Sequence, residues 1–344
     1  MPRWRTARAW AARVLLALGA LCGATLAPAQ APSPRAIDVP PWFLDSFLDI
    51  ADEAATVAKN GKRLMLYFGQ DGCPYCSELM QTSFTQKDIV DKTRTHFEVV
   101  ALNIFGDREV TWIDGQRFTE KAFARHLKVQ FTPTLLFLDE QGRVTTRLNG
   151  YWPPHRFSPA LDYVIARLHD KVSLADHLAQ HATEPARAQL NVQPFLMKPP
   201  FDLRRKAQGK PLAVLFETRR CQACDEMHIE GFQRPEVRAQ LERLDIARFA
   251  LDDATEVTRP DGSRSSAQAW AKELRIAYTP TVVFFDASNR EVFRFEGYLR
   301  PFHLASSFEY VAQRGYRTHP EFQRFLQDKA ERSRAAGKPV DLWR

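Results

Sequence analysis

The sequence lacks a long apolar run, a clustered basic stripe and a recognisable cofactor motif. Its most apolar stretch, Val14 to Leu26, spans 13 residues, fewer than the ~20 that a membrane-spanning helix needs. Basic residues do not alternate with aromatic residues along one stripe, so we expect no nucleic-acid partner. No motif for NADPH or flavin is present, so we expect no bound cofactor. Five cysteines are present, and Cys22 lies in the apolar stretch.

The N-terminus has the three parts of a secretory signal peptide. Four arginines come first, the apolar stretch follows, and Ala27-Pro28-Ala29 forms an A-x-A cleavage site. We predict a signal peptide over 1–29 and a linker over 30–44. Leu21 stands before Cys22, where a lipoprotein signal takes a small residue, so we expect cleavage rather than lipidation. The four arginines that would be lost are Arg3, Arg5, Arg8 and Arg13.

The predicted signal peptide bears on both the charge of the mature chain and its location. The formal charge falls from +7 to +3, so the basic balance mostly reflects targeting. The mature protein is expected to be soluble in the periplasm or another exported, oxidising compartment.

The remaining chain contains one long repeat. Phe68 and Cys73 correspond to Phe216 and Cys221 at a shift of 148, and later motifs match at a shift of 147. A period this long suits two whole domains rather than a solenoid. We predict domains over 45–170 and 201–315, a connector over 171–200 and a charged tail over 316–344.

All four remaining cysteines fall into two short pairs at the same place in each copy. These are Cys73-Pro74-Tyr75-Cys76 and Cys221-Gln222-Ala223-Cys224. Each follows an apolar run typical of a buried strand and precedes a helical pattern. A cysteine at a helix N-terminus is favoured as thiolate, the species that attacks disulfides. The pattern therefore indicates thiol–disulfide chemistry.

The apolar periodicity predicts an α/β unit in each copy, with a central mixed sheet and helices on both faces. The predicted order is helix, strand, cysteine-bearing helix, strand, helix, two strands and helix. In the first copy we expect a helix over 42–59, strands over 63–69, 97–103, 134–138 and 143–148, and later helices over 118–127 and 157–168. In the second copy we expect strands over 212–216, 246–251, 281–285 and 291–295, and helices over 267–274 and 302–313.

The chain resembles the thioredoxin superfamily over roughly 45–170 and 195–315, as two tandem thioredoxin-like domains. In detail it is similar to exported proteins encoded with sulfur-oxidation systems. The resemblance rests on three segments: Tyr67 to Cys76, Gly106 to Val110 and Phe131-Thr132-Pro133-Thr134. The resemblance implies that Cys73 and Cys221 attack and that Cys76 and Cys224 resolve the mixed disulfide.

The resemblance also implies a substrate loop and partners. Thr132-Pro133 and Thr279-Pro280 would form cis-proline loops that face the cysteines and receive a substrate strand. Proline cannot donate to a sheet ladder, so its recurrence at both strand starts needs such a reason. The implied partners are exported proteins with disulfides and an electron donor in the membrane.

Some positions depart from the family pattern. Thioredoxins have tryptophan before the pair, where this chain has Gly72 and Arg220. They have a buried aspartate six residues before the first cysteine, where this chain has Tyr67 and Leu215. Proton transfer to the resolving thiol must therefore use water or another group.

Charges near the second pair also differ from those near the first. Arg219 and Arg220 favour the Cys221 thiolate, whereas Asp225 and Glu226 act in the opposite direction.

Four alternatives remain open beside an oxidoreductase that reduces or isomerises disulfides. The pairs could be structural disulfides, or the protein could be a dithiol oxidase. Cys221, Cys224 and His228, with Met80 at the matching position of the first copy, could hold copper or zinc, although three ligands do not close a site. The fold could also serve as a binding or chaperone module, with 150–154 and 297–301 as contact surfaces.

Overall fold

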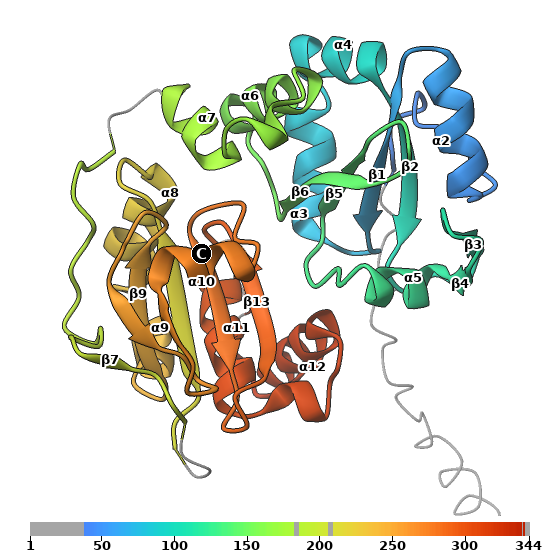
Figure 1. The fold of residues 1–344 in the computed structure, drawn as a ribbon. Coiled ribbons are helices and arrows are strands. Elements are labelled where there is room, and N and C mark those ends of the chain that lie inside the picture. Colours follow the sequence, from blue (N-terminus) through green and yellow to red (C-terminus); the bar gives the residue numbers. More distant parts are fainter. Residues whose placement is uncertain (1–37, 182–185, 206–208, 339, 341–344) are drawn as a thin grey trace, which may run out of the picture. The chain divides into compact units, whose positions relative to one another are not determined.

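A computed structural model describes residues 38–181, 186–205, 209–338 and 340. The predicted signal peptide and the first part of the predicted linker lie outside these residues. Among the described residues, each copy of the repeat forms its own four-stranded sheet (Figure 1).

The first copy is built around a sheet with the strand order β2-β1-β5-β6. β1 is parallel to β2 and antiparallel to β5, and β5 is antiparallel to β6, so the sheet is mixed as predicted. β3 and β4 form a separate short hairpin. The elements are α2 (Ile50–Lys59), β1 (Arg63–Gly69), α3 (Pro74–Glu78), the π-helical turn η1 (Leu79–Ser83), α4 (Lys87–His96), β2 (Phe97–Asn103), β3 (Glu109–Thr111), β4 (Arg117–Thr119), α5 (Glu120–His126), β5 (Thr134–Leu138), β6 (Val144–Asn149), α6 (Pro154–Ile165), the 3-10 turn η2 (Leu168–Asp170) and α7 (Leu174–Gln180).

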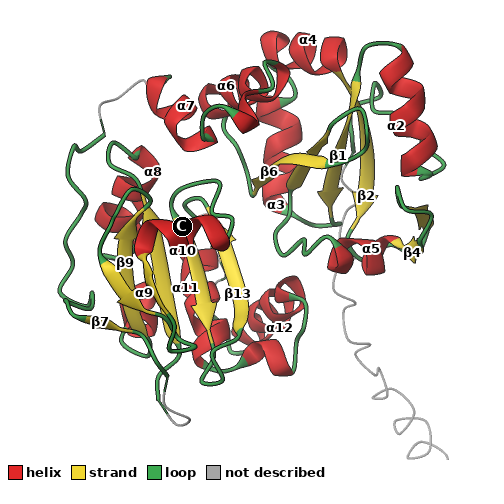
Figure 2. Cartoon of the chain, viewed as in Figure 1, coloured by secondary structure: helices red, strands yellow, loops and turns green. Residues whose placement is uncertain are grey.

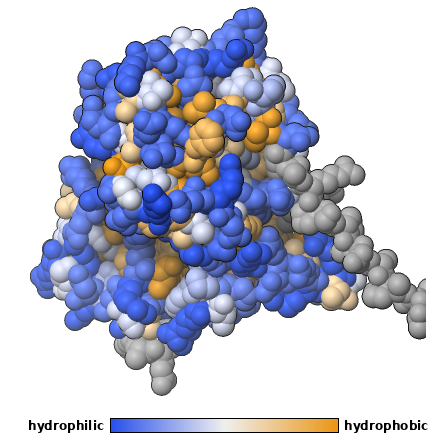
Figure 3. All heavy atoms as spheres, turned by 90° about the vertical axis from the view of Figure 1, so that its right-hand side faces the viewer, coloured by the Kyte–Doolittle hydropathy of each residue, from blue (hydrophilic) through white to orange (hydrophobic). Residues whose placement is uncertain are grey.

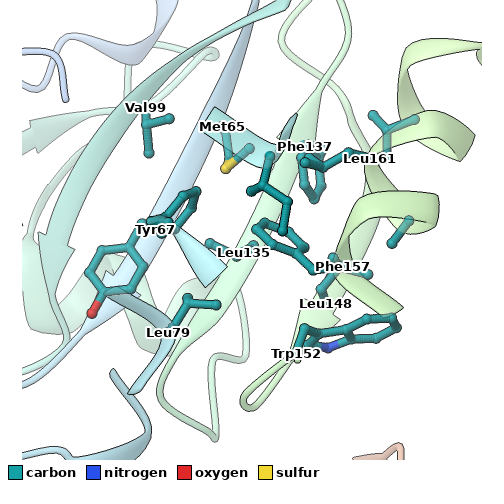
Figure 4. Close-up of a cluster of buried hydrophobic side chains, with 14 of the residues drawn as sticks. Met65, Tyr67, Leu79, Val99, Leu135, Phe137, Leu148, Trp152, Phe157 and Leu161 are labelled. Atoms are coloured by element: carbon teal, nitrogen blue, oxygen red, sulfur yellow. The ribbon is translucent and has the colours of Figure 1, made fainter. Parts of the chain in front are cut away.

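Alternation along β1 divides its side chains between the two faces of the sheet. Met65 and Tyr67 belong to the cluster on one face, and Leu64, Leu66 and Phe68 to the cluster on the other. Side chains of α3, α4 and α6 join the first cluster, and those of α2 and α5 join the second. Figure 4 shows part of the first cluster, where β1 and β5 meet α6. The cysteine-bearing helix is thus anchored to one face of the sheet.

The second copy repeats this sheet with the order β13-β12-β8-β9 (Figure 2). β8 is parallel to β9 and antiparallel to β12. The elements are β7 (Phe201–Asp202), β8 (Leu212–Glu217), α8 (Gln222–Glu226), the π-helical turn η3 (Met227–Gly231), α9 (Pro235–Leu241), β9 (Asp245–Ala250), β10 (Glu256–Thr258), β11 (Arg264–Ser266), α10 (Ala267–Glu273), β12 (Thr281–Phe285), β13 (Glu291–Glu296), α11 (Pro301–Ala312), the 3-10 turn η4 (Gly315–Arg317) and α12 (Phe322–Ala335).

The core of the second copy includes part of the predicted charged tail. Phe322, Phe325 and Leu326 of α12 are buried in the same cluster as Ala213 and Leu215 of β8. Charged residues of the helix fall mainly on its other positions, so the tail is an amphipathic helix that belongs to this core.

Three predicted element starts are wrong. The first helix begins at Ile50 rather than Trp42, because Asp49 caps it and Leu44 instead bridges to Val100 of β2. The second copy begins with the strand β7, which pairs with β10, and not with a helix. The helix expected from Phe118 starts at Glu120, since the preceding residues form β4.

The strand boundaries agree closely with the predictions, whereas α6 begins and ends three residues before the helix predicted over 157–168. β1, β2, β5 and β12 match the predicted strands, and β6, β8, β9 and β13 differ by a residue or two. The helices α4 and α9 were not predicted.

Hydrophilic residues cover most of the face that Figure 3 draws, with apolar residues gathered in small patches. Among the helices in the described part of the chain, none combines the length and the apolar character needed to cross a bilayer.

Candidate active site

The first cysteine pair lies where β1 ends and α3 begins. Cys73 is the N-cap of α3, and Pro74 is its first residue, a position where a missing N–H costs no helical hydrogen bond. The backbone N–H of Cys76 lies 3.1 Å from Cys73 Sγ, and the two sulfurs form a disulfide. Cys73 is 3% exposed and Cys76 is fully buried.

The second pair repeats this arrangement between β8 and α8. Cys221 is the N-cap of α8, the N–H of Cys224 lies 3.1 Å from Cys221 Sγ, and the sulfurs form a disulfide. The Cα–Cα distances are 5.3 Å in the first pair and 5.2 Å in the second. Cys224 is buried like Cys76, but Cys221 is half-buried and thus more open than Cys73. Each predicted attacking cysteine therefore lies beside its predicted resolving partner.

The residue before each pair has a left-handed backbone. Gly72 has φ +70° and Arg220 has φ +58°. Glycine adopts this conformation without cost, whereas a side chain as in arginine makes it less favourable. These are the positions at which the chain lacks the tryptophan of thioredoxins.

A cis-proline loop faces each pair, as the resemblance implied. The Thr132–Pro133 and Thr279–Pro280 peptide bonds are both cis. The carbonyl oxygen of Thr132 lies 3.6 Å from Cys73 Sγ. The hydroxyl of Thr279 lies 3.6 Å from Cys221 Sγ, and its oxygen is also 2.9 Å from that of Thr218.

The same contacts hold the cis-proline loop in both copies. Thr134 Oγ1 donates to the carbonyl of Phe131 at 2.8 Å, and Thr281 Oγ1 donates to that of Tyr278 at 2.7 Å. The N–H of Gly150 donates to Pro133 at 2.8 Å, and that of Gly297 donates to Pro280 at 2.7 Å. The backbone N–H of Gly150 or Gly297 therefore anchors the loop in each copy.

The charges beside the second pair are partly neutralised. Arg219 makes two contacts with Asp252, at 2.7 and 2.8 Å. Asp225 accepts hydrogen bonds from the backbone of Arg187 at 2.8 Å and from the amide of Asn191 at 2.6 Å. The Arg219 charge is thus compensated by Asp252, whereas Asp225 is held by neutral amides and keeps its charge.

Tyr67 and Leu215 occupy the position of the thioredoxin aspartate and are both buried. Burial raises the pKa of the Tyr67 phenol, whose oxygen has no hydrogen-bond partner among the described residues. Neither side chain supplies a carboxylate at this position.

A buried pair near the second site was not predicted from the sequence. His228 Nε2 lies 2.8 Å from Glu217 Oε1, and both side chains are fully buried. His228 had been considered as a metal ligand with Cys221 and Cys224. Here both sulfurs are in the disulfide and Nε2 is engaged by Glu217. Across the described residues, no group of three or more His, Cys, Asp or Glu side chains is arranged to hold a metal ion. The signal available in the sequence was Glu217, a carboxylate at the end of an otherwise apolar strand.

Several solved structures resemble parts of the chain. A thioredoxin-fold protein from Helicobacter pylori is 25% identical over 36% of this chain and 83% of its own, with a TM-score of 0.31. A thioredoxin from Thermus thermophilus is 24% identical over 34% and 84%, with a TM-score of 0.28. A disulphide isomerase from Xylella fastidiosa is 18% identical over 39% and 95%, with a TM-score of 0.25. No curated protein matches the chain.

The family comparison is more direct. The thioredoxin-like domain family matches twice, over residues 50–165 and 204–312, which together make up well over half of the chain. Both matches contain a cysteine pair and its cis-proline loop. The chain therefore belongs to the thioredoxin-like domain family, of which it contains two tandem copies.

Proposed function

We propose that this protein is an exported thiol–disulfide oxidoreductase that reduces or isomerises disulfides of other exported proteins. The observation that supports this most directly is the geometry repeated in both copies. In each, an N-cap cysteine bonded to a buried partner lies 3.6 Å from the threonine of a cis-proline loop.

The reaction begins from the reduced pair. The thiolate of Cys73 or Cys221 is stabilised by the free N–H groups of the helix start, including that of Cys76 or Cys224. It attacks one sulfur of a client disulfide, forms a mixed disulfide, and releases the other client sulfur as thiolate. The resolving cysteine then attacks the first cysteine, which closes the protein disulfide and releases the reduced client.

The cis-proline loops provide the place for the client. Thr132 and Thr279 lie at the cysteine sulfurs, and Pro133 and Pro280 follow them at the start of β5 and β12. A client strand along this loop brings its disulfide to the attacking sulfur.

Electrons must then be returned to the oxidised pairs. A membrane protein that donates an electron pair would restore the two thiols of an oxidised pair. An outside donor is needed because the sequence has no motif for NADPH or flavin. The more specific resemblance to exported proteins encoded with sulfur-oxidation systems would place the clients in the periplasm or another exported compartment. A dithiol oxidase would use the same geometry in the opposite direction.

Turnover of a disulfide-bonded protein by the mature chain, with dithiothreitol as electron source, tests the proposal. We expect reduction of the client by the wild type and loss of most activity in the Cys73→Ser/Cys221→Ser double variant. The single variants show which copy acts on a given client. Unchanged turnover in the double variant would contradict the enzymatic role.

A further inference from the structure

The Glu217–His228 pair is an unusual feature of the second copy because both members are fully buried and ionisable. Their hydrogen bond uses Glu217 Oε1 and His228 Nε2. Glu217 Oε2 and His228 Nδ1 are also buried, and neither has a partner among the described residues. Leaving such polar atoms without partners is costly, so a stable fold retains them for a reason.

The pair joins the end of β8 to the helical segment that follows the resolving cysteine. α8 continues directly into η3, and His228 follows Cys224 by four residues, so the two share a helix face. Glu217 ends β8 and alternates with Leu215 and Ala213, which face the cluster that includes Met227 of η3. Strand and helix thus both present the pair on the Cys224 side of the sheet.

The first copy has different residues at the matching positions. The shift of 148 aligns Glu217 with Gly69 and His228 with Met80. A Cβ atom on Gly69 would lie 2.4 Å from the hydroxyl oxygen of Tyr67, so a phenol occupies this space. Burial raises the pKa of that phenol, which keeps it neutral. Of the two copies, the second alone has two ionisable side chains in contact at these positions.

We propose that the Glu217–His228 pair accepts the thiol proton of Cys224 when this cysteine resolves a mixed disulfide. The inference rests on the proposed function of the second copy. Glu217 holds the Nε2–H tautomer, and Nδ1 is the free base of the imidazole ring.

The step balances as follows in atoms and electrons. The Cys224 proton moves to His228, and the thiolate attacks Cys221 Sγ. The bond between Cys221 and the client sulfur breaks, and the client sulfur leaves as thiolate. The two cysteine thiols lose two electrons to the client disulfide, and the proton on His228 then passes to the leaving thiolate or to water.

The buried setting favours this transfer. A carboxylate beside a neutral imidazole has a net charge of −1, and the accepted proton makes the pair neutral overall, which lowers the cost of burial. Charged groups on the neighbouring elements include Arg248 and Asp225. Arg248 of β9 is in register with Leu215 and donates to the carbonyl of Asn191, and Asp225 of α8 accepts from the Asn191 amide.

A rate measurement on the isolated step tests the proposal. In a Cys73→Ser/Cys76→Ser background, the reduced mature protein, which lacks Cys22, reacts with an aromatic disulfide reagent whose thiolate absorbs light. The first thiolate is released as Cys221 forms the mixed disulfide, and the second as Cys224 closes the pair. The rate of the second release is followed from pH 5.5 to pH 9.5 in wild type, Glu217→Gln and His228→Gln.

We expect closure in both variants to be about a hundredfold slower than wild type at pH 6, within the range for general base catalysis. The difference should narrow as the pH rises past the ordinary thiol pKa of ~8.5, because a growing fraction of Cys224 ionises unaided. Equal rates at pH 6, or the same slowing at every pH, would overturn the proposal, since a structural role gives no pH signature.

Two controls complete the design. Both variants retain a hydrogen-bonding amide, and thermal unfolding checks that each is folded. Met80→Leu, measured in a Cys221→Ser/Cys224→Ser background, should leave closure of the first pair unchanged at every pH. Because the assay needs no protein client, the pH signature stands or falls separately from client turnover.

Discussion

At the scale of single residues, the two copies hold their sulfurs in the same way but expose them differently. Cys76 and Cys224 are both buried behind the first cysteine of their pair, which fits a resolving role. Cys73 is 3% exposed, whereas Cys221 is half-buried.

Removal of a resolving cysteine should trap clients. In Cys76→Ser and Cys224→Ser, the attacking cysteine forms a mixed disulfide that cannot be closed. With these variants, we expect bands on a non-reducing gel at the combined mass of the protein and a client. Cys73→Ser and Cys221→Ser should form no such adduct through the altered pair. Adducts that depend on Cys76 or Cys224 instead would reverse the assigned roles.

The difference in exposure predicts a difference in reactivity. After reduction of the folded protein, iodoacetamide should modify Cys221 before Cys73, because the reagent must reach the sulfur. Mass spectrometry of timed samples gives the order, and unfolded protein, in which both sulfurs are exposed, is the control. Faster modification of Cys73 would contradict the burial seen here.

At the scale of elements, the hairpins after the cis-proline loops have the same turn in both copies. Asp139 accepts from the N–H groups of Gln141 and Arg143 and from the Arg143 side chain. Asp286 accepts from Ser288 and Arg290 in the same pattern. Burial alone would raise the pKa of each carboxyl, but these hydrogen bonds outweigh it and lower the pKa.

These turns predict part of the acid sensitivity. A carboxyl with a lowered pKa stabilises the fold above its unfolded value of ~3.9, and this contribution is lost as pH falls through the folded pKa. Wild type should therefore lose more stability between pH 5 and pH 2 than Asp139→Asn/Asp286→Asn. Urea unfolding across this pH range measures the free energy of unfolding of both proteins. An equal loss in wild type and the double variant would contradict the stabilising role of the two carboxylates.

The C-terminal helix α12 gives a second prediction for the fold. Phe322 is fully buried in the core of the second copy, so Phe322→Ala should lower the free energy of unfolding by about 3–5 kcal/mol. Arg332 of the same helix is exposed, and Arg332→Ala should change it by less than about 0.5 kcal/mol. Equal effects in denaturant unfolding would show that α12 does not belong to this core.

The elements also show what the sequence could predict. Buried strands such as β1 and β12 are short apolar runs, and their bounds were predicted correctly. The predicted start of α2 was wrong because Asp49 caps the helix, although the apolar spacing suggested helix before it. The strand β7 was not predicted because two residues are too few to give a pattern. The cysteine pairs and cis-proline loops could be predicted from local motifs. The Glu217–His228 contact could not, because it joins a strand and a helix.

In the molecule as a whole, one fold occurs twice, and the two copies differ in the residues at matching positions near the cysteine pairs. Tyr67, Gly69 and Met80 in the first copy are replaced by Leu215, Glu217 and His228 in the second. The sheet order and loop geometry are the same in both, so this exchange changes the chemistry and not the architecture. We therefore expect the two sites to serve different steps or clients rather than to duplicate one activity.

We expect both pairs to be redox-active rather than structural, and their reduction potentials distinguish these two roles. Each pair is equilibrated with dithiothreitol or glutathione at pH 7 and quantified by alkylation and mass spectrometry. We predict that both interconvert reversibly at potentials above about −300 mV, with values near about −270 mV if the protein acts as a reductant. Potentials below about −300 mV for both pairs, as in structural disulfides, would contradict the account.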